Sequence, residues 1–187
     1  MADIILENEA LKSGKLRYKH LIGKPFSMGH NDCYSMLRNM YKDNLDIELT
    51  NYARPNDWWL EEGQNLYVDR YKQEGFFLLE EPDLADLQPL DVMLIAIPDP
   101  RNLSKTVTNH CAIYLGEGTV IHHRLGTLSS IAPYRGVLRN LTTHIIRHKQ
   151  APDLKPKYRN TLNSVDFILP HKKELVMEAV NESNFND

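Results

Sequence analysis

The chain has 187 residues, 42% of them hydrophobic, which is enough to bury one core and is typical of a single domain. Its 22 Lys and Arg residues are mixed with 25 Asp and Glu residues, and the formal net charge is −3. Because no sustained basic stripe is available to bind a phosphate backbone, nucleic acid is not expected as a partner.

The composition also excludes two kinds of targeting segment. No run approaches the ~18 apolar residues that cross a bilayer. The first 20 residues place acids before bases and contain no apolar stretch, so we expect no signal peptide and no direct membrane insertion. The two cysteines, Cys33 and Cys111, are too few for a disulfide scaffold. Although one bridge could form, we expect two free thiols.

The N-terminal part of the chain predicts one clear helix. Two short extended segments, residues 4–6 and 16–18, precede the turn-rich stretch GKPFSMGHND, which ends in two residues typical of helix N-caps. From Cys33 onward, apolar residues recur at the spacing of a helix that lies on a core: Met36, Leu37, Met40 and Tyr41. Cys33 is therefore expected in the first turn of this helix, at the edge of its buried face.

A second helical region is predicted after Pro55. It begins at Asn56 or Asp57 and extends to about Glu74, with Gly75 as the C-cap. A glycine at position 63 interrupts the pattern, so one helix and two helices are equally expected.

The remainder of the predicted core consists of strands. Short segments rich in β-branched and aromatic residues follow position 75, separated by turn signals such as PDPRN, GEG and PYRG: FFLL, DVMLIAI, NHCAIYL, TVIHHRL and LTTHIIRH. Helices followed by neighbouring strands predict an α+β fold, with N-terminal helices packed on a small antiparallel β-sheet. Residues 1–150 are expected to form this domain. Residues 151–187 lose the strand rhythm and are expected to form an extended C-terminal arm that contacts an assembly partner.

Cys33 is a candidate nucleophile because of its place in the first helix. A thiol attacks as the thiolate, and the free N–H groups of a first helical turn lower the pKa of a thiol beside them. The same N–H groups can donate to an oxyanion. The alternative is that Cys33 is a small buried hydrophobic residue, as most free cysteines are.

Two histidines are candidates for the proton transfer that a thiol nucleophile requires. His110 opens an apolar strand, and His122 follows 12 residues later (122 − 110) across the turn signal GEG. An antiparallel hairpin would place both at the same end, so that His122 contacts His110 while His110 faces Cys33. His123 competes for the role of His122, because only one of two neighbouring strand residues faces the site. A single histidine in a strand is more often structural.

These residues resemble a known family, the NlpC-type cell-wall cysteine peptidases, and in particular its phage lambda-like tail-assembly members at the tail tip. The resemblance covers about residues 23–147 and rests on four segments in the family's order: GKPFSMGHNDCYSMLRNMY, LQPLDVMLIAI, NHCAIYLG and TVIHHRLG. It implies a papain-like NlpC-type fold. It also implies a Cys-His-His triad, with Cys33 as nucleophile, His110 as base and His122 as the residue that orients the base.

The resemblance further implies a function and a place. Members of the family hydrolyse amide bonds in peptidoglycan stem peptides through an acyl-enzyme, without a metal or another cofactor. In phage tails, this implies a virion protein of the tail tip, with other tail-tip proteins as partners, that opens the cell wall as the genome passes through the host envelope and periplasm. Such a protein is made in the host cytoplasm without a signal peptide.

Three positions depart from the family pattern. Phe26 stands where the family often has a tyrosine that helps to bind the oxyanion, Tyr34 follows the cysteine where cellular members prefer serine, and Leu90 replaces a glycine. Phe26, Asp32 and Tyr34 thus define the expected substrate and oxyanion region, with Asp32 as the helix N-cap. A catalytically weak or inactive structural adaptor or plug of the tail tip, and an acyltransferase or amidase, are the alternatives.

Two further features were weighed as binding sites. Cys111 must face away from His110 on an extended strand, which argues against a zinc site built from the cysteines and histidines. Trp58 and Trp59 are neighbours on an expected helix, where their side chains diverge by about 100°. We therefore expect one of them in the core and the other at the surface or at an interface.

Overall fold

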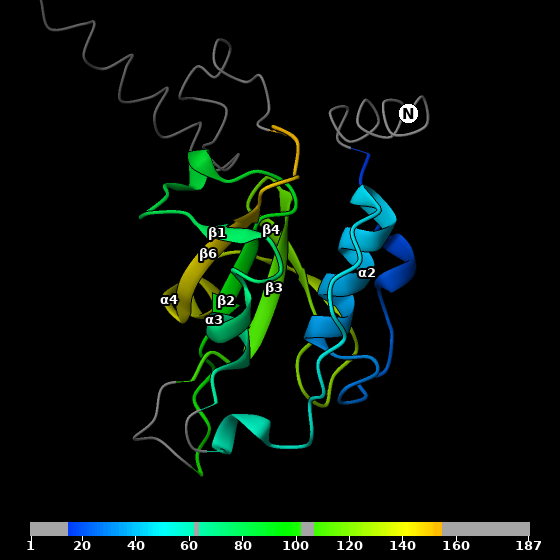
Figure 1. The fold of residues 1–187 in the computed structure, drawn as a ribbon, viewed down its shortest axis with the longest axis vertical. Coiled ribbons are helices and arrows are strands. Elements are labelled where there is room, and N and C mark those ends of the chain that lie inside the picture. The colour runs from blue at the N-terminus through cyan, green and yellow to red at the C-terminus, as the bar shows by residue number, and fades with distance from the viewer. Residues whose placement is uncertain (1–14, 62–63, 102–106, 155–187) are drawn as a thin grey trace, which may run out of the picture. The chain divides into compact units, whose positions relative to one another are not determined.

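A six-stranded sheet forms the centre of the domain (Figure 1). The computed structural model describes residues 15–61, 64–101 and 107–154. Every neighbouring pair of strands in the order β1-β6-β2-β3-β4-β5 is antiparallel. The strands are β1 (Phe76–Leu78), β2 (Val92–Ile95), β3 (His110–Gly116), β4 (Thr119–His122), β5 (Ser130–Pro133) and β6 (Thr142–His148).

Short helices surround one longer helix. The α-helices are α2 (Cys33–Leu45), α3 (Leu66–Arg70) and α4 (Val137–Asn140), and the 3₁₀ helices are Lys19–Leu21, Trp58–Leu60 and Leu84–Asp86. In the three described ranges, no helix combines the length and the apolar character needed to cross a bilayer. Helices packed on an antiparallel sheet confirm the α+β class predicted from the sequence.

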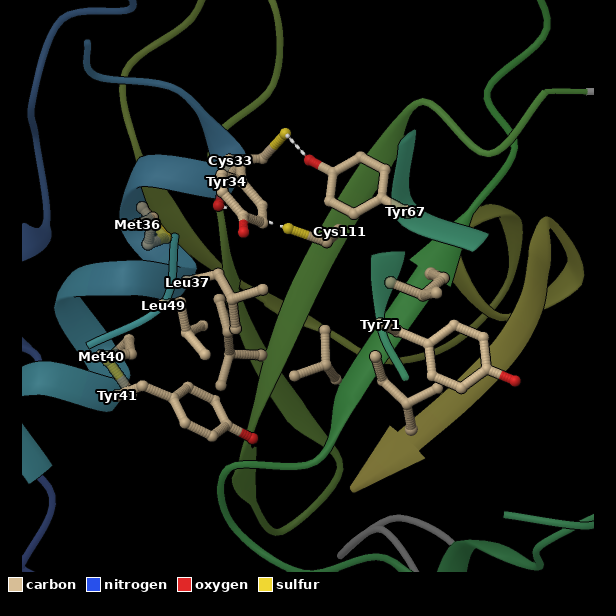
Figure 2. Packing of buried hydrophobic residues seen from close by; sticks show 14 of the residues in the cluster. Cys33, Tyr34, Met36, Leu37, Met40, Tyr41, Leu49, Tyr67, Tyr71 and Cys111 are labelled. Atoms are coloured by element: carbon tan, nitrogen blue, oxygen red, sulfur yellow. Dashed lines mark hydrogen bonds between the residues drawn. The ribbon is translucent and has the colours of Figure 1, made fainter. Parts of the chain in front are cut away.

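Helix α2 packs against β3, as Figures 1 and 2 show. The four residues of its predicted apolar stripe are all buried, with exposed fractions of 4% or less. They share one core with residues of the facing side of the sheet, namely Val92, Leu94, Cys111, Ile113, Ile121 and Ile146. The alternate strand residues face the opposite side and form a second core, which includes Met93, Ile95, Ala112, Tyr114 and Val120. The period of two along the strands thus gives both faces of the sheet an apolar layer.

The second helical region forms two short helices rather than one. Residues Trp58–Leu60 and Leu66–Arg70 are helical, and α3 has Tyr71 as its C-cap, so the predicted end at about Glu74 with Gly75 as C-cap is wrong. Gly75 lies in the turn before β1 with a φ of 87°, which suits a residue without a side chain. The predicted extended segment at residues 16–18 is described but forms no strand, and residues 4–6 lie outside the described ranges. β5 and α4 were not predicted, because the mostly exposed segment Ser130–Pro133 lacks an alternating apolar pattern.

The predicted C-terminal arm is described only at its start. Residues 155–187 lie outside the described ranges. Gln88 holds the first part of the arm through both ends of its amide. Its Nε2 donates to the carbonyl of Pro152 at 3.0 Å, and its Oε1 accepts from the N–H of Leu154 at 3.2 Å. Leu154 is buried, so the chain is still attached to the domain at this residue.

Leu90, which stands where the resemblance expects glycine, adopts the backbone conformation that favours glycine. Its φ is 74°, a left-handed value that costs an ordinary residue about 1–2 kcal/mol. The side chain is 1% exposed, and its burial recovers about 1.5–3 kcal/mol. The Tyr41 hydroxyl of α2 also donates to the carbonyl of Leu90 at 2.6 Å. Packing and this hydrogen bond therefore hold the turn that leads into β2.

A buried ion pair fixes the start of α2. The side chains of Asp32 and Arg54 are only 2% and 1% exposed, and Nε of Arg54 donates to Oδ2 of Asp32 at 2.8 Å. Asp32 also caps the helix by accepting the N–H of Ser35 at 2.8 Å. The other end of the guanidinium donates to the carbonyl of Gly29 and to the hydroxyl of Ser35, both at 3.0 Å. One arginine therefore binds the turn before α2, its cap and its first turn.

This pair sets the ionisation of Asp32. Burial raises the pKa of the carboxyl group, but hydrogen bonds from Arg54 and from the Ser35 amide outweigh it, so that the pKa of Asp32 is lowered. Because its pKa is lowered on folding, ionised Asp32 stabilises the folded protein at pH values above the ordinary carboxyl pKa of about 3.9. This contribution is lost as the pH falls through the pKa that Asp32 has in the folded protein.

We expect Arg54→Met to lower the free energy of unfolding by about 3–5 kcal/mol at pH 7, because it leaves a buried carboxylate without a partner. Urea denaturation at pH 7 and pH 3 measures this. The difference in the free energy of unfolding between wild type and variant should be smaller at pH 3, because the unpaired Asp32 of the variant is then protonated.

The double variant D32N/R54M is the matched control. It removes both charges while asparagine still caps the helix, so it should be more stable than Arg54→Met alone. If Arg54→Met lowers the free energy of unfolding by less than about 1 kcal/mol, the pair is not important for stability, since exposed ion pairs contribute that little.

Candidate active site

Cys33 is the first residue of α2 and is 9% exposed. The Asp32 side chain takes the N–H of Ser35, and the carbonyl of Asp32 takes the N–H of Met36. Within the described part of the chain, no acceptor takes the N–H of Cys33. The thiol therefore lies at the positive end of a helix dipole, next to a backbone donor that a ligand can use.

His110 and His122 meet across the β3–β4 hairpin. His122 is paired with Ala112, two residues from His110, so both histidines lie on the same side of the sheet. Nε2 of His110 lies 3.2 Å from Nδ1 of His122, and the ring centroids are 5.4 Å apart. The hairpin predicted from GEG is confirmed in its antiparallel register.

His122 has an environment that keeps it neutral. Burial, and then the charge of His110, lower the pKa of His122 to about 4. In the tautomer of neutral His122 that carries its proton on Nε2, Nδ1 is the acceptor for Nε2–H of His110. Nδ1 of His110 is then the nitrogen left to exchange a proton with a thiol.

The Cys33 thiol has a strongly lowered pKa. The neighbouring Cys111 thiol contributes most to the lowering, burial opposes it, and His110 adds to the lowering. The lowered pKa favours the thiolate of Cys33, the form in which a cysteine is a strong nucleophile.

Cys111 supports Cys33 from the sheet. The two thiols are free and buried, and Cys111 faces α2 from β3 (Figure 2). Its thiol donates to the carbonyl of Cys33 at 3.3 Å. Burial, together with the neighbouring Cys33, raises the pKa of Cys111, which keeps it protonated as a donor. Sequence reasoning expected Cys111 to be a free thiol and weighed it as a disulfide partner or metal ligand, but not as a residue that supports Cys33.

Cys33 and His110 line a cleft with a volume of about 210 Å³. Its aromatic lining consists of Phe26, Trp58, Trp59 and Tyr67. The expectation that one tryptophan faces solvent is wrong, because Trp58 and Trp59 are 3% and 8% exposed. They lie in a 3₁₀ helix rather than a long α-helix, and Nε1 of Trp59 donates to Asp99 at 2.8 Å.

The three residues of the expected oxyanion region lie in different surroundings. Phe26 lines the cleft and packs its ring edge-on against His123 at 5.2 Å. Asp32 is occupied by the helix cap and Arg54. The Tyr34 hydroxyl donates to the carbonyl of Thr50 at 3.0 Å and is therefore engaged away from the thiol. The part of Tyr34 beside the thiol is its backbone N–H, in the first turn of α2.

His123 and Tyr67 complete the surroundings of the thiol and imidazole. Nε2 of His123 lies 3.1 Å from the carbonyl oxygen of Thr127, so its ring is bound locally while His122 contacts His110. The hydroxyl of Tyr67 lies 3.1 Å from Sγ of Cys33. Sequence reasoning missed Tyr67, because α3 is short and nothing in its local pattern relates it to a residue 34 positions earlier.

Two curated proteins are similar to this chain over most of its length. The Tail tip assembly protein K of Escherichia phage lambda is 35% identical over 130 residues, which are 70% of this chain and 60% of that protein. The Tail tip assembly protein K of Escherichia phage N15 is 28% identical over 134 residues, which are 69% of this chain and 49% of that protein. The chain thus spans about half to three fifths of the length of these relatives.

Solved structures and a family profile give the final comparison. An NlpC/P60 family protein from Bacillus cereus ATCC 10987 has a TM-score of 0.47 and 18% identity, over 75% of this chain and 40% of its own. NlpC2 from Trichomonas vaginalis has a TM-score of 0.43 and 18% identity, over 76% of this chain and 46% of its own. The NlpC/P60 family profile matches residues 23–147, well over half of the sequence, and the chain belongs to the NlpC/P60 family.

Proposed function

We propose that this chain is a phage tail-tip cysteine peptidase that hydrolyses amide bonds in peptidoglycan stem peptides. The observation that supports it most is the Cys33 thiol at the start of α2, with its pKa lowered by Cys111 and His110. Membership of the NlpC/P60 family and the similarity to two phage proteins named for tail tip assembly support the cell wall as substrate and the tail tip as location.

The geometry supports a two-step acyl transfer. In the first step, the Cys33 thiolate attacks the amide carbonyl carbon, a C–S bond forms, and the carbonyl π electrons move to oxygen. The N–H of Cys33 donates to this oxyanion. The C–N bond then breaks as the imidazolium of His110 gives its proton to the leaving amine.

In the second step, His110 acts as a base toward water. The hydroxide that forms attacks the thioester carbonyl, and collapse of the intermediate breaks the C–S bond and restores the thiolate. His122 contributes by accepting Nε2–H of His110, which selects the tautomer and holds the ring in place through both steps.

The cleft suits a short peptide better than a folded protein. Its volume of about 210 Å³ is that of a few residues' side chains, and aromatic rings form much of its wall. The charged residues that line it are Asp99 and the buried pair of Asp32 and Arg54. A stem peptide, which combines short apolar and charged residues, matches this lining.

The relatives' names favour a second function, a structural adaptor or plug of the tail tip without strong catalysis. The limited exposure of Cys33 at 9% and the absence of a hydroxyl on Phe26 agree with it. An amidase built on the same residues differs from the peptidase in its substrate, and an acyltransferase passes the acyl group to an acceptor other than water.

Purified protein incubated with isolated sacculi should release stem-peptide fragments detectable by mass spectrometry, and Cys33→Ala should abolish the release because the nucleophile is gone. Cys33→Ser in the phage particle distinguishes the two functions. Particles that assemble but fail to deliver DNA support the peptidase. Fully infectious particles, together with an inert wild-type protein under reducing conditions, would favour the adaptor.

Iodoacetamide should label Cys33 much faster than Cys111, because the pKa of Cys33 is lowered and that of Cys111 is raised. An ordinary thiol has a pKa of about 8.5, so the Cys33 rate should reach its plateau well below that pH. Intact-mass kinetics from pH 5 to 9 measure this, with Cys33→Ala as the control that retains only Cys111. Faster labelling of Cys111 would count against a thiolate at Cys33.

His122→Ala should lower kcat on sacculi on the order of 10²-fold or more, because the base loses its orienting acceptor. His122→Asn retains an oxygen acceptor and should preserve more of the activity. Thermal unfolding of both variants controls for loss of fold. Equal activity of the alanine and asparagine variants would show that the contact at 3.2 Å does not orient His110.

A further inference from the structure

The hydroxyl of Tyr67 is held against the sulfur of Cys33. Tyr67 lies in α3, is 5% exposed and lines the cleft. Its hydroxyl oxygen lies 3.1 Å from Sγ, and Figure 2 shows the side chain pointing from α3 toward the thiol at the start of α2. Two segments that are distant in sequence thus place a phenol beside the proposed nucleophile.

The ring of Tyr67 is fixed by its neighbours. It packs edge-on against Tyr34 with centroids 5.8 Å apart, and against Trp58 at 6.0 Å. This packing explains the ring but not the hydroxyl, which faces a sulfur atom. A thiol is a weak acceptor, whereas a thiolate accepts a charge-assisted hydrogen bond.

The hydroxyl keeps its proton. Burial raises the pKa of Tyr67 well above its ordinary value, and the neighbouring thiols Cys111 and Cys33 raise it further. Tyr67 is therefore a donor at every pH at which the proposed peptidase would act, and it cannot compete with His110 as a base.

We propose that Tyr67 is a catalytic residue whose hydroxyl donates first to the Cys33 thiolate and then to the oxyanion that forms on the carbonyl carbon bonded to this sulfur. This inference rests on the proposed function. When the C–S bond forms, the negative charge moves from sulfur to the adjacent oxygen, and a donor in contact with the sulfur needs only a small shift to follow it. The proton stays on Tyr67 throughout, since the leaving amine takes its proton from His110.

Tyr67 also adds a hydrogen-bond donor to the cleft. Phe26 lines the same cleft and has no hydroxyl, whereas the backbone N–H of Cys33 lies beside the thiol and no described residue accepts from it. Two donors that converge on one oxygen stabilise an oxyanion more strongly than one.

Tyr67→Phe tests the proposal because it removes the hydroxyl and keeps the packed ring. Two reagents separate its roles: p-nitrophenyl acetate acylates Cys33 through an oxyanion, whereas iodoacetamide alkylates it without one. We expect the burst of p-nitrophenolate to slow on the order of 10²–10³-fold in Tyr67→Phe. Alkylation should change less than tenfold, which also shows that the site remains folded.

Tyr71→Phe is the matched control, because Tyr71 is a buried tyrosine at the C-terminal end of the same helix and is not part of the cleft lining. Neither reaction should change in it. The proposal is overturned if Tyr67→Phe slows both reactions equally, if it slows neither, or if the wild type is not acylated at Cys33. If acylation depends on Tyr67 but the protein does not cleave sacculi, the proposed substrate is wrong. The proposed role of Tyr67 is then still supported.

Discussion

The site depends on one buried ion pair, that of Asp32 and Arg54. Removing two charges from water is costly, and such a pair is stable only when the remaining hydrogen-bonding groups are satisfied. Here Asp32 accepts from two backbone N–H groups as well as from Arg54, while Arg54 binds carbonyl and hydroxyl oxygens on both sides of the helix start. This pair decides where α2 begins, and the first residue of α2 is Cys33.

A thiolate in this position lies beside groups from two elements, β3 and α3. Cys111 and His110 are consecutive residues of β3 that reach Cys33 from different sides, and Tyr67 approaches from α3. Low local polarity strengthens each of these contacts and makes an unpaired charge more costly. The arrangement therefore favours the ionised form of Cys33, and a thiolate is the form of cysteine that acts as a nucleophile.

The sequence determined the features that local physics controls. The apolar spacing after Cys33 predicted α2, because a helix with that stripe must lie on a core. The alternation along β3 and β4 and the turn between them predicted a hairpin with His110 and His122 toward one end. Asp32 was predictable as a cap from its place before the apolar stripe.

Only the tertiary structure decided which groups meet. The choice between His122 and His123 required the register and twist of the hairpin, and the two buried tryptophans required the 3₁₀ helix that positions them. Leu90 adopts a left-handed conformation that local preference alone would favour only for glycine. Its burial in the core and the hydrogen bond from Tyr41 offset the cost of this conformation. Arg54 and Tyr67 reach Asp32 and Cys33 from 22 and 34 residues away, and no periodicity relates them. Such contacts follow from packing, since their free energy exists only once the elements that bear them have come together.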